Sequence, residues 1–236
     1  MSPDASDAMP ARPLFRLADY APPAWLVERV VLRVELHPTD TRVHAEIGFR
    51  ANPAVPRADL RLDGRALGFV SAAIDGEALD KTALAIDAEG LTVPADRLPH
   101  DTFTWTAETA IDPQANTALE GLYLSDGIFC TQCEAQGFRK ITWYPDRPDV
   151  MAPFTVRIEG DAPVLLSNGN PVGLGEGWAE WHDPWPKPAY LFALVAGDLV
   201  AHHDSFVTRS GKTVDLALWV RPGDEGKCAW GMEALK

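Results

Sequence analysis

An all-β fold, antiparallel and saddle-shaped or sandwich-like, is what this sequence predicts. Apolar residues alternate with polar ones in several short runs, and that period of two places one face of a strand on a core. The chain also holds 20 prolines and 18 glycines, which would interrupt most helices. Only residues 229–236 begin to look helical, so we expect a β-rich chain that ends in the start of a helix.

Two runs near the amino terminus give the clearest strand signal. Residues 30–36 and 43–49 are apolar at every second position, and turn formers lie between them at residues 38–40. This arrangement predicts an antiparallel hairpin. Similar alternation recurs at residues 60–62, 102–107 and 214–220. The pairs Asp75-Gly76 and Asn168-Gly169 are expected to be turns.

The pattern divides the chain into three parts. Residues 1–24 contain five prolines and are expected to form a loosely ordered arm. Residues 25–228 carry the strands and are interpreted as one antiparallel β domain. Residues 229–236 begin a helix that stops in the middle of its apolar-polar pattern without a cap, so we expect them to be the cut start of a linker or helix leading to a further domain.

Composition and charge exclude several classes of function. The chain has 236 residues, of which 46% are hydrophobic and 23% charged, as is usual for a globular protein with a sizeable core. Its net charge of −13 disfavours nucleic acid and anionic membranes as partners. The sequence does not start with a basic region followed by an apolar stretch, and no run approaches the roughly 18 apolar residues that span a bilayer. We therefore expect a cytoplasmic protein.

One segment carries a resemblance to a known family. Residues 121–139, G-L-Y-L-S-D-G-I-F-C-T-Q-C-E-A-Q-G-F-R, resemble the segment of aminopeptidase N that meets the free amino end of the substrate. The next block, I-T-W-Y-P-D-R-P-D-V-M-A-P-F at residues 141–154, is similar to the Asp-Arg-Pro-Asp-Val region of that family. Residues 165–170 and 183–198 also look like the bacterial branch. The resemblance covers residues 121–236, and the first half of the chain is assigned by continuity.

The resemblance implies the amino-terminal domain of a zinc-dependent aminopeptidase, which removes amino-terminal residues from peptides. The chemistry of that family needs H-E-x-x-H on a helix, in which two imidazoles hold zinc and the Glu activates its water. No pair among the histidines has this spacing around a Glu; they are His37, His44, His100, His182, His202 and His203. We therefore expect no metal in this chain, zinc in the full-length enzyme, a missing catalytic domain as partner, and no catalysis by this chain alone.

Glu134 and Gln132 are the residues to which the resemblance gives a role, the binding of the substrate's free α-amino group. A carboxylate suits an ammonium group because the two form a charge-assisted hydrogen bond, and this contact would place the first peptide bond on the metal. Gln132 lies two residues earlier, so on an extended strand its side chain would project on the same side. From residue type alone, both would more simply be exposed positions on a strand, since surface Glu is common.

Other clusters are interpreted as structural. Cys130 and Cys133 form a C-x-x-C, but a structural zinc site needs four ligands and only Cys228 remains as a third thiol, so reduced, buried thiols are expected. The His-His-Asp run at 202–204 would point to opposite faces of a strand. The Asp-Arg-Pro-Asp run at 146–149 is typical of a salt-bridged turn. The tryptophans at 178, 181 and 185 suit a core or an interdomain face better than a sugar platform.

Two competing functions remain open at this stage. The first is a stand-alone β module that binds a peptide or another protein without peptidase activity. It would be favoured if the reading frame stopped at Lys236, whereas continuation into an H-E-x-x-H would favour the fragment of a peptidase. The second is an aromatic-rich domain that binds carbohydrate, for which glycans should quench tryptophan fluorescence and peptides should have no effect. We rank the carbohydrate hypothesis last.

Overall fold

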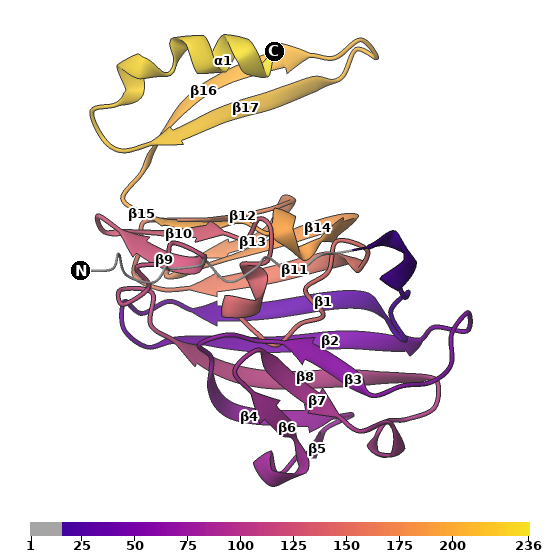
Figure 1. The fold of residues 1–236 in the computed structure, drawn as a ribbon. Helices are drawn as coiled ribbons and strands as arrows, with labels where there is room; N and C mark the ends of the chain where they lie inside the picture. Colours follow the sequence, from indigo (N-terminus) through magenta and orange to yellow (C-terminus); the bar gives the residue numbers. More distant parts are fainter. Residues whose placement is uncertain (1–15) are drawn as a thin grey trace, which may run out of the picture.

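The computed structural model describes residues 16–236, and strands dominate them (Figure 1). The strands are β1 (Trp25–Glu35), β2 (Thr41–Ala51), β3 (Leu60–Asp63), β4 (Gly68–Ile74), β5 (Glu77–Ala78), β6 (Ala85–Asp87), β7 (Gly90–Val93), β8 (Thr102–Ile111), β9 (Gly121–Ser125), β10 (Ile128–Gln132), β11 (Met151–Glu159), β12 (Val164–Ser167), β13 (Asn170–Gly175), β14 (Trp178–Pro188), β15 (Leu194–Gly197), β16 (Val200–Val207) and β17 (Thr213–Val220). The α-helix is α1 (Ala229–Leu235), and the short 3₁₀ turns are η1 (Leu17–Asp19), η2 (Lys81–Ala83), η3 (Ala95–Arg97), η4 (Phe138–Lys140), η5 (Ala189–Leu191) and η6 (Glu225–Lys227).

The strands form four sheets of unequal size. The largest has eight strands in the order β13-β14-β11-β1-β2-β8-β4-β5. A four-stranded sheet runs β12-β15-β10-β9, a three-stranded sheet runs β3-β7-β6, and β16 pairs only with β17. The prediction of an all-β, mostly antiparallel chain with one helix at its end is confirmed for residues 16–236. The arm predicted for residues 1–24 falls mostly outside the described residues.

The eight-stranded sheet buries the alternating positions that the sequence shows. Neighbouring strands bring apolar side chains into rows that cross the sheet. One such row runs from β11 to β4 through Phe154, Val30, Ile47, Trp105 and Ile74. All five side chains are buried. The predicted hairpin of residues 30–36 and 43–49 is confirmed as the antiparallel pair β1 and β2.

The pairing of β1 with β11 is parallel, which the alternation did not indicate. Val30 is paired with Phe154 and Glu35 with Glu159, so strands from the two halves of the chain lie side by side at the middle of the sheet. A period of two identifies the buried face of a strand but gives no information on the direction of its neighbour. The first half of the chain and the segment that carries the resemblance are therefore parts of one sheet.

A single hydrophobic core joins the three larger sheets. Its buried side chains come from β1, β2, β8 and β11 of the large sheet, from β3 and β7 of the three-stranded sheet, and from β9, β10, β12 and β15 of the four-stranded sheet. We refer to residues 25–197, which contain these sheets, as the body. Because β9 and β10 belong to it, the segment after β10 starts from a well-packed support.

The last strands and the helix form a separate element. In Figure 1, β16 and β17 stand apart from the body, and α1 lies along them. We refer to residues 200–236 as the hairpin unit. Met232 of α1 is buried there, and an added Cβ at Gly231 would lie 3.4 Å from the side chain of Leu218. The strand predicted at 214–220 and the helix predicted after residue 228 are confirmed.

Candidate functional site

The segment with the family resemblance forms a β-hairpin followed by a tight loop. β9 and β10 are antiparallel and pair Gln132 with Gly121 at their open end. At the closed end, Asp126 and Gly127 both have positive φ angles, as a two-residue hairpin turn requires. The chain leaves β10 at Gln132, turns through residues 133–137 and enters η4. We refer to residues 133–137 as the 133–137 loop.

Two glycines permit the close approach on which the 133–137 loop depends. The N–H of Gly137 donates to the carbonyl of Cys133 at 2.8 Å and closes the loop. A Cβ at Gly137 would lie 2.3 Å from the backbone oxygen of Gln132. Gly121 has a φ of +72°, and a Cβ there would lie 2.7 Å from the Cβ of Lys140. Larger residues at either position would push the loop away from the strand pair.

Glu134 and Gln132 both lie exposed at this end of the hairpin. Gln132 is the last residue of β10, but Glu134 lies in the turn, so the expected extended geometry with both side chains on one strand face is wrong. Instead the two are linked directly, because the Gln132 Nε2 donates to the backbone oxygen of Glu134 at 3.1 Å. The peptide bond between Glu134 and Ala135 is cis. The structure brings the two predicted residues together by a local turn.

A hollow of about 230 Å³ opens beside Glu134. Its lining residues come from three places in the chain: Glu134, Ala135 and Gln136 of the loop, Pro148 and Tyr190. The sequence pattern placed Pro148 only in a salt-bridged turn and gave Tyr190 no role. The available signal was that both lie inside the blocks of family resemblance, at 141–154 and 183–198.

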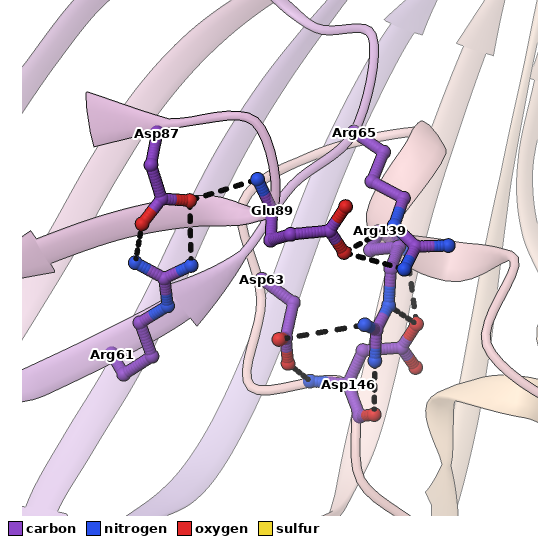
Figure 2. A network of polar contacts seen from close by, with 7 residues as sticks. All are labelled: Arg61, Asp63, Arg65, Asp87, Glu89, Arg139 and Asp146. Carbon is purple, nitrogen blue, oxygen red and sulfur yellow. Dashed lines mark hydrogen bonds and ion pairs between the residues drawn. The ribbon is translucent and has the colours of Figure 1, made fainter. Parts of the chain in front are cut away.

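A buried ion pair lies directly beyond the loop. Arg139 of η4 and Asp146 have side chains that are 8% and 3% exposed, and the Arg139 Nε donates to the Asp146 Oδ2 at 3.1 Å. Burial raises the pKa of Asp146, and the hydrogen bonds from Arg139 oppose that shift. Figure 2 shows the pair together with Asp63. The local pattern predicts a salt-bridged turn for Asp146 and gives no sign that Arg139 is its partner.

The turn at residues 145–149 is salt-bridged, as predicted. Arg147 donates to both carboxylate oxygens of Asp149, from Nε at 2.8 Å and from Nη2 at 2.6 Å. This bond lowers the pKa of Asp149. Arg147 also donates to the backbone oxygen of Ala21, and the Tyr20 hydroxyl donates to Asp149 at 3.1 Å. The turn therefore holds the segment that leads into β1.

The thiols lie in different surroundings and none is in a disulfide. Cys133 is 2% exposed, and burial raises the pKa of its thiol to about 12. Cys130 is half-buried, and burial raises the pKa of its thiol as well. A thiol with a raised pKa is a poor metal ligand and a poor nucleophile at neutral pH. These positions fit the interpretation of Cys133 as a small buried residue.

The remaining polar and aromatic clusters also have local explanations. His202 and His203 are consecutive on β16 and pair with Leu218 and Ala217, so they face opposite sides of the hairpin. The three tryptophans lie on β14. Trp178 stacks under Arg157 at 4.0 Å, Trp181 donates to the backbone oxygen of Leu165 at 3.1 Å, and Trp185 is 77% exposed.

Residues 16–236 offer no donor set for the zinc that the resemblance implies. No three His, Cys, Asp or Glu side chains lie close enough together within that range to hold a metal ion. The exposed carboxylate of Glu134 belongs to no such group of three, which suits an organic cation better than a metal. We therefore derive no metal chemistry from this chain. No helix within the same range is long and apolar enough to cross a membrane.

Comparison with known proteins places the chain in a family. The Peptidase M1 N-terminal domain family matches residues 20–191. The aminopeptidase N of Caulobacter vibrioides is 49% identical over 227 residues, which are 93% of this chain and 26% of that protein. The aminopeptidase N of Escherichia coli is 44% identical over 226 residues, 92% of this chain and 25% of that protein. This chain belongs to the Peptidase M1 N-terminal domain family, and it spans about a quarter of the length of these relatives.

Solved structures agree with this assignment. The Legionella pneumophila aminopeptidase A, solved in complex with aspartic acid, superposes with a TM-score of 0.86 at 31% identity, over 94% of this chain and 27% of that chain. The M1 zinc metallopeptidase of Deinococcus radiodurans superposes with a TM-score of 0.70 at 19% identity, over 85% of this chain and 48% of that chain, and so supports the fold alone. The resemblance inferred from residues 121–236 is confirmed, and it extends to the first half of the chain.

Proposed function

We propose that this chain is the part of a zinc-dependent aminopeptidase that binds the free amino end of a peptide substrate. Glu134 accepts a charge-assisted hydrogen bond from the substrate's α-ammonium group. Gln132 offers its Oε1 as a second acceptor, because its Nε2 is already donated to the backbone of Glu134. The zinc and the bond cleavage belong to a catalytic region outside this chain, so the chain recognises the substrate without catalysing its hydrolysis.

The observation that carries this proposal is an exposed carboxylate on a fixed loop, inside the segment of residues 121–139 that resembles the family. Gly137 closes the loop on Cys133, and Gln132 holds the backbone of Glu134. A group that is already fixed before the ligand arrives loses little conformational entropy on binding. An exposed Glu on a mobile surface segment would lack that advantage.

The relatives support the class of substrate. Two of them are named aminopeptidase N, and the Legionella relative is an aminopeptidase solved with aspartic acid, a ligand that carries a free α-amino group. Zinc in the full-length enzyme follows from the resemblance to the zinc-dependent aminopeptidases, which the match to the Peptidase M1 N-terminal domain family supports. Cleavage at the amino end of a peptide needs a contact that recognises the ammonium group, and Glu134 supplies the matching charge.

The test is the substitution Glu134→Gln in the full-length protein that contains this chain. Loss of a hydrogen bond between charged groups costs on the order of 1.5–3 kcal/mol, so kcat/KM for an aminoacyl anilide should fall roughly 10- to 150-fold while zinc content is kept. Gln132→Ala removes a neutral acceptor, worth about 0.5–1.5 kcal/mol, together with the bond from Gln132 to the backbone of Glu134. An N-acetylated substrate never forms the contact, so discrimination between free and blocked ends should shrink.

A matched control makes the same change of charge at a position away from the site. Glu77 is an exposed carboxylate on β5, the far edge strand of the large sheet, and Glu77→Gln should leave kcat/KM unchanged. If Glu134→Gln stayed within about twofold of the parent enzyme, a difference of roughly 0.4 kcal/mol, Glu134 would be an ordinary surface residue and the proposal would be wrong.

A further inference from the structure

The Arg139–Asp146 pair is unusual because both charges lie inside the body. Their side chains are only 8% and 3% exposed. Removing two charges from water is costly, and a well-packed apolar pair often stabilises a fold at least as well. What an ion pair adds is directional bonding that fixes the relative position of two segments. The hydrogen bonds of the Arg139–Asp146 pair therefore show which segments it holds together.

The pair bonds to the main chain of both residues. The Asp146 Oδ2 accepts from the backbone N–H of Arg139 at 3.2 Å as well as from its Nε at 3.1 Å. In the other direction, the Arg139 Nη2 donates to the backbone oxygen of Asp146 at 3.0 Å. Three bonds in different directions hold η4 and the 145–149 turn in one relative placement.

Asp63 connects the pair to a strand of the three-stranded sheet. Its Oδ2 accepts from the backbone N–H of Asp146 at 3.0 Å, and its Oδ1 lies 3.5 Å from the Arg139 Nη1 (Figure 2). Asp63 ends β3, and its backbone pairs with Tyr144 through N–H to oxygen contacts of 2.8 and 3.1 Å. Both segments are thus tied to the same strand end.

The hollow beside Glu134 is lined by residues 134–136, which precede η4, and by Pro148 of the 145–149 turn. The 133–137 loop reaches Arg139 through the buried Phe138, and Asp146 lies two residues before Pro148. The loop also borders a second hollow of about 340 Å³, whose lining includes Gln136, Arg139 and Asp146. Cys133 and Phe138 anchor the two ends of the loop in the core, whereas residues 134–136 are exposed. The polar bonds of Arg139 and Asp146 therefore add directional contacts to the packing at the base of the loop.

We propose that Arg139 and Asp146 are positioning residues for Glu134. The pair holds the 133–137 loop against the 145–149 turn, so that the Glu134 carboxylate meets the α-ammonium group of a peptide substrate at a fixed place. This inference rests on the proposed function, and it adds what holds the Glu134 carboxylate in the position that this function needs. A misplacement on the order of 1 Å is enough to weaken such a contact strongly.

The test uses the full-length protein and two inhibitors that differ only in the amino group. Leucine hydroxamate and 4-methylpentanohydroxamic acid share their metal-binding group, so the ratio of their inhibition constants isolates the ammonium contact. Asp146→Asn and Arg139→Met should each reduce the preference for the amine by about tenfold, with KM for an aminoacyl anilide rising more than kcat falls. Arg139→Lys keeps the charge but loses the forked geometry, and should reduce the preference less.

A double variant shows whether the pair acts through Glu134. In Glu134→Gln the charge-assisted contact is already lost, so adding Asp146→Asn should cause a much smaller further fall in the preference for the amine than it causes alone. Two controls separate positioning from stability. Arg61→Met breaks the exposed pair of Arg61 with Asp87, whose contacts are 2.8 and 2.9 Å, and Ile47→Ala opens the core at β2. Neither control should change the preference.

Each outcome decides one of the two proposals. If Glu134→Gln lowers the preference for the amine while Asp146→Asn and Arg139→Lys stay within about twofold of the parent, the positioning role is overturned and the role of Glu134 stands. An equal fall in Ile47→Ala would also overturn it, because mere destabilisation would then explain the effect. If Glu134→Gln leaves the preference unchanged, the proposed function itself fails. Should Arg139→Met not fold, Asp146→Asn and Arg139→Lys provide the same measurement.

Discussion

The body and the hairpin unit are built from the same sequence pattern, but they differ in how far that pattern is buried. In β2 of the body, Val43, Ile47 and Phe49 are at most 1% exposed. In β17 of the hairpin unit, the equivalent alternating residues Leu216 and Leu218 are only half-buried. Every residue of β16 and β17 is half-buried or exposed. Alternation thus predicts a strand without predicting that anything covers it.

Burial differs between the two regions because different elements cover their strands. The inner face of the eight-stranded sheet is covered by two other sheets, whereas the hairpin is covered by α1, a helix of seven residues with Met232 buried. Trp219 and Trp230 remain 40% and 83% exposed. The family match, at residues 20–191, also ends before the hairpin unit begins. We therefore expect the body to unfold as one cooperative unit and the hairpin unit to open locally at lower cost.

The largest expected effect is a contrast between two apolar truncations. Phe154 is 1% exposed and packs against Phe138, Tyr144 and Phe192 at centroid distances of 5.9, 6.4 and 6.1 Å. Phe154→Ala should lower the free energy of unfolding by about 3–5 kcal/mol, because it leaves a cavity in a close-packed core. Leu218→Ala should cost only about 1 kcal/mol, since that side chain is half-buried. Urea unfolding followed by far-UV circular dichroism measures both, and equal losses would remove the distinction between the regions.

The second effect compares two thiols of similar static burial. Cys133 in the body is 2% exposed and Cys228 in the hairpin unit is 5% exposed. In variants that each retain one of them, iodoacetamide at about pH 8 should alkylate Cys228 at least about 100-fold faster, because local opening of α1 costs less than opening of the body. The raised pKa of Cys133, about 12, acts in the same direction by keeping its thiol protonated.

Alkylation under denaturing conditions is the control for the thiol prediction. In concentrated guanidinium the two thiols lose their folded surroundings, so their rates should converge to within about threefold. Similar protection of Cys133 and Cys228 in the native protein would show that the hairpin unit is as stable as the body. Mass spectrometry of the modified peptides gives both rates.

Much of the fold could be predicted because its signal is local. The β1–β2 hairpin, β8, β17 and α1 each follow from spacing within one short segment. The parallel partner β11 could not, because Val30 and Phe154 meet across more than half of the chain. β14 was also missed as a strand, since it contains Pro184, Pro186 and Pro188, and proline argues against a ladder strand. In the structure a register shift between Ala152 and Phe154 leaves Pro184 and Pro186 without ladder partners, and Pro188 pairs with Met151 at the end of the strand.

The candidate site also has one part that a local pattern predicts and one part that depends on residues far apart in the sequence. Gln132 and Glu134 were found because a contiguous block resembles a family, and the structure brings them together by a short turn. The polar contacts of Arg139, Asp146 and Asp63 beneath them could not be predicted. The bond between Asp146 and Asp63, for example, joins residues 83 positions apart. No periodicity or motif specifies which carboxylate a buried arginine will meet, and that choice depends on the tertiary packing.

A smaller effect is expected from removal of the whole hairpin unit. A chain that ends after Asp198 retains β15 and all the sheets of the body. Its thermal midpoint should fall by less than about 4 °C, because a change of 1 kcal/mol corresponds to roughly 2–4 °C in a protein of this size. Differential scanning calorimetry of the shortened and the full 236-residue chain makes the comparison. Loss of a cooperative transition would mean that the hairpin unit is part of the core.

The smallest effect concerns the contact at the base of the hairpin unit. The Arg221 Nη2 donates to the backbone oxygen of Ser125 at 3.1 Å, and its Nε lies 3.8 Å from the Asp126 Oδ2, with both side chains largely exposed. The shorter contact is a hydrogen bond and the longer one is screened by water, so the carbonyl should hold the arginine more firmly than the carboxylate does.

Arg221→Met should therefore loosen the junction, and Asp126→Asn should not. Loss of one exposed hydrogen bond, about 0.5–1 kcal/mol, predicts a two- to fivefold rise in amide exchange for peptides covering residues 198–207. Hydrogen exchange followed by mass spectrometry can detect a change of that size. If the ion pair were the stronger contact, both substitutions would speed exchange, and about 1 M salt would abolish the difference between each variant and the parent. A salt-insensitive effect confined to Arg221→Met is the result that would assign the contact to the Ser125 carbonyl.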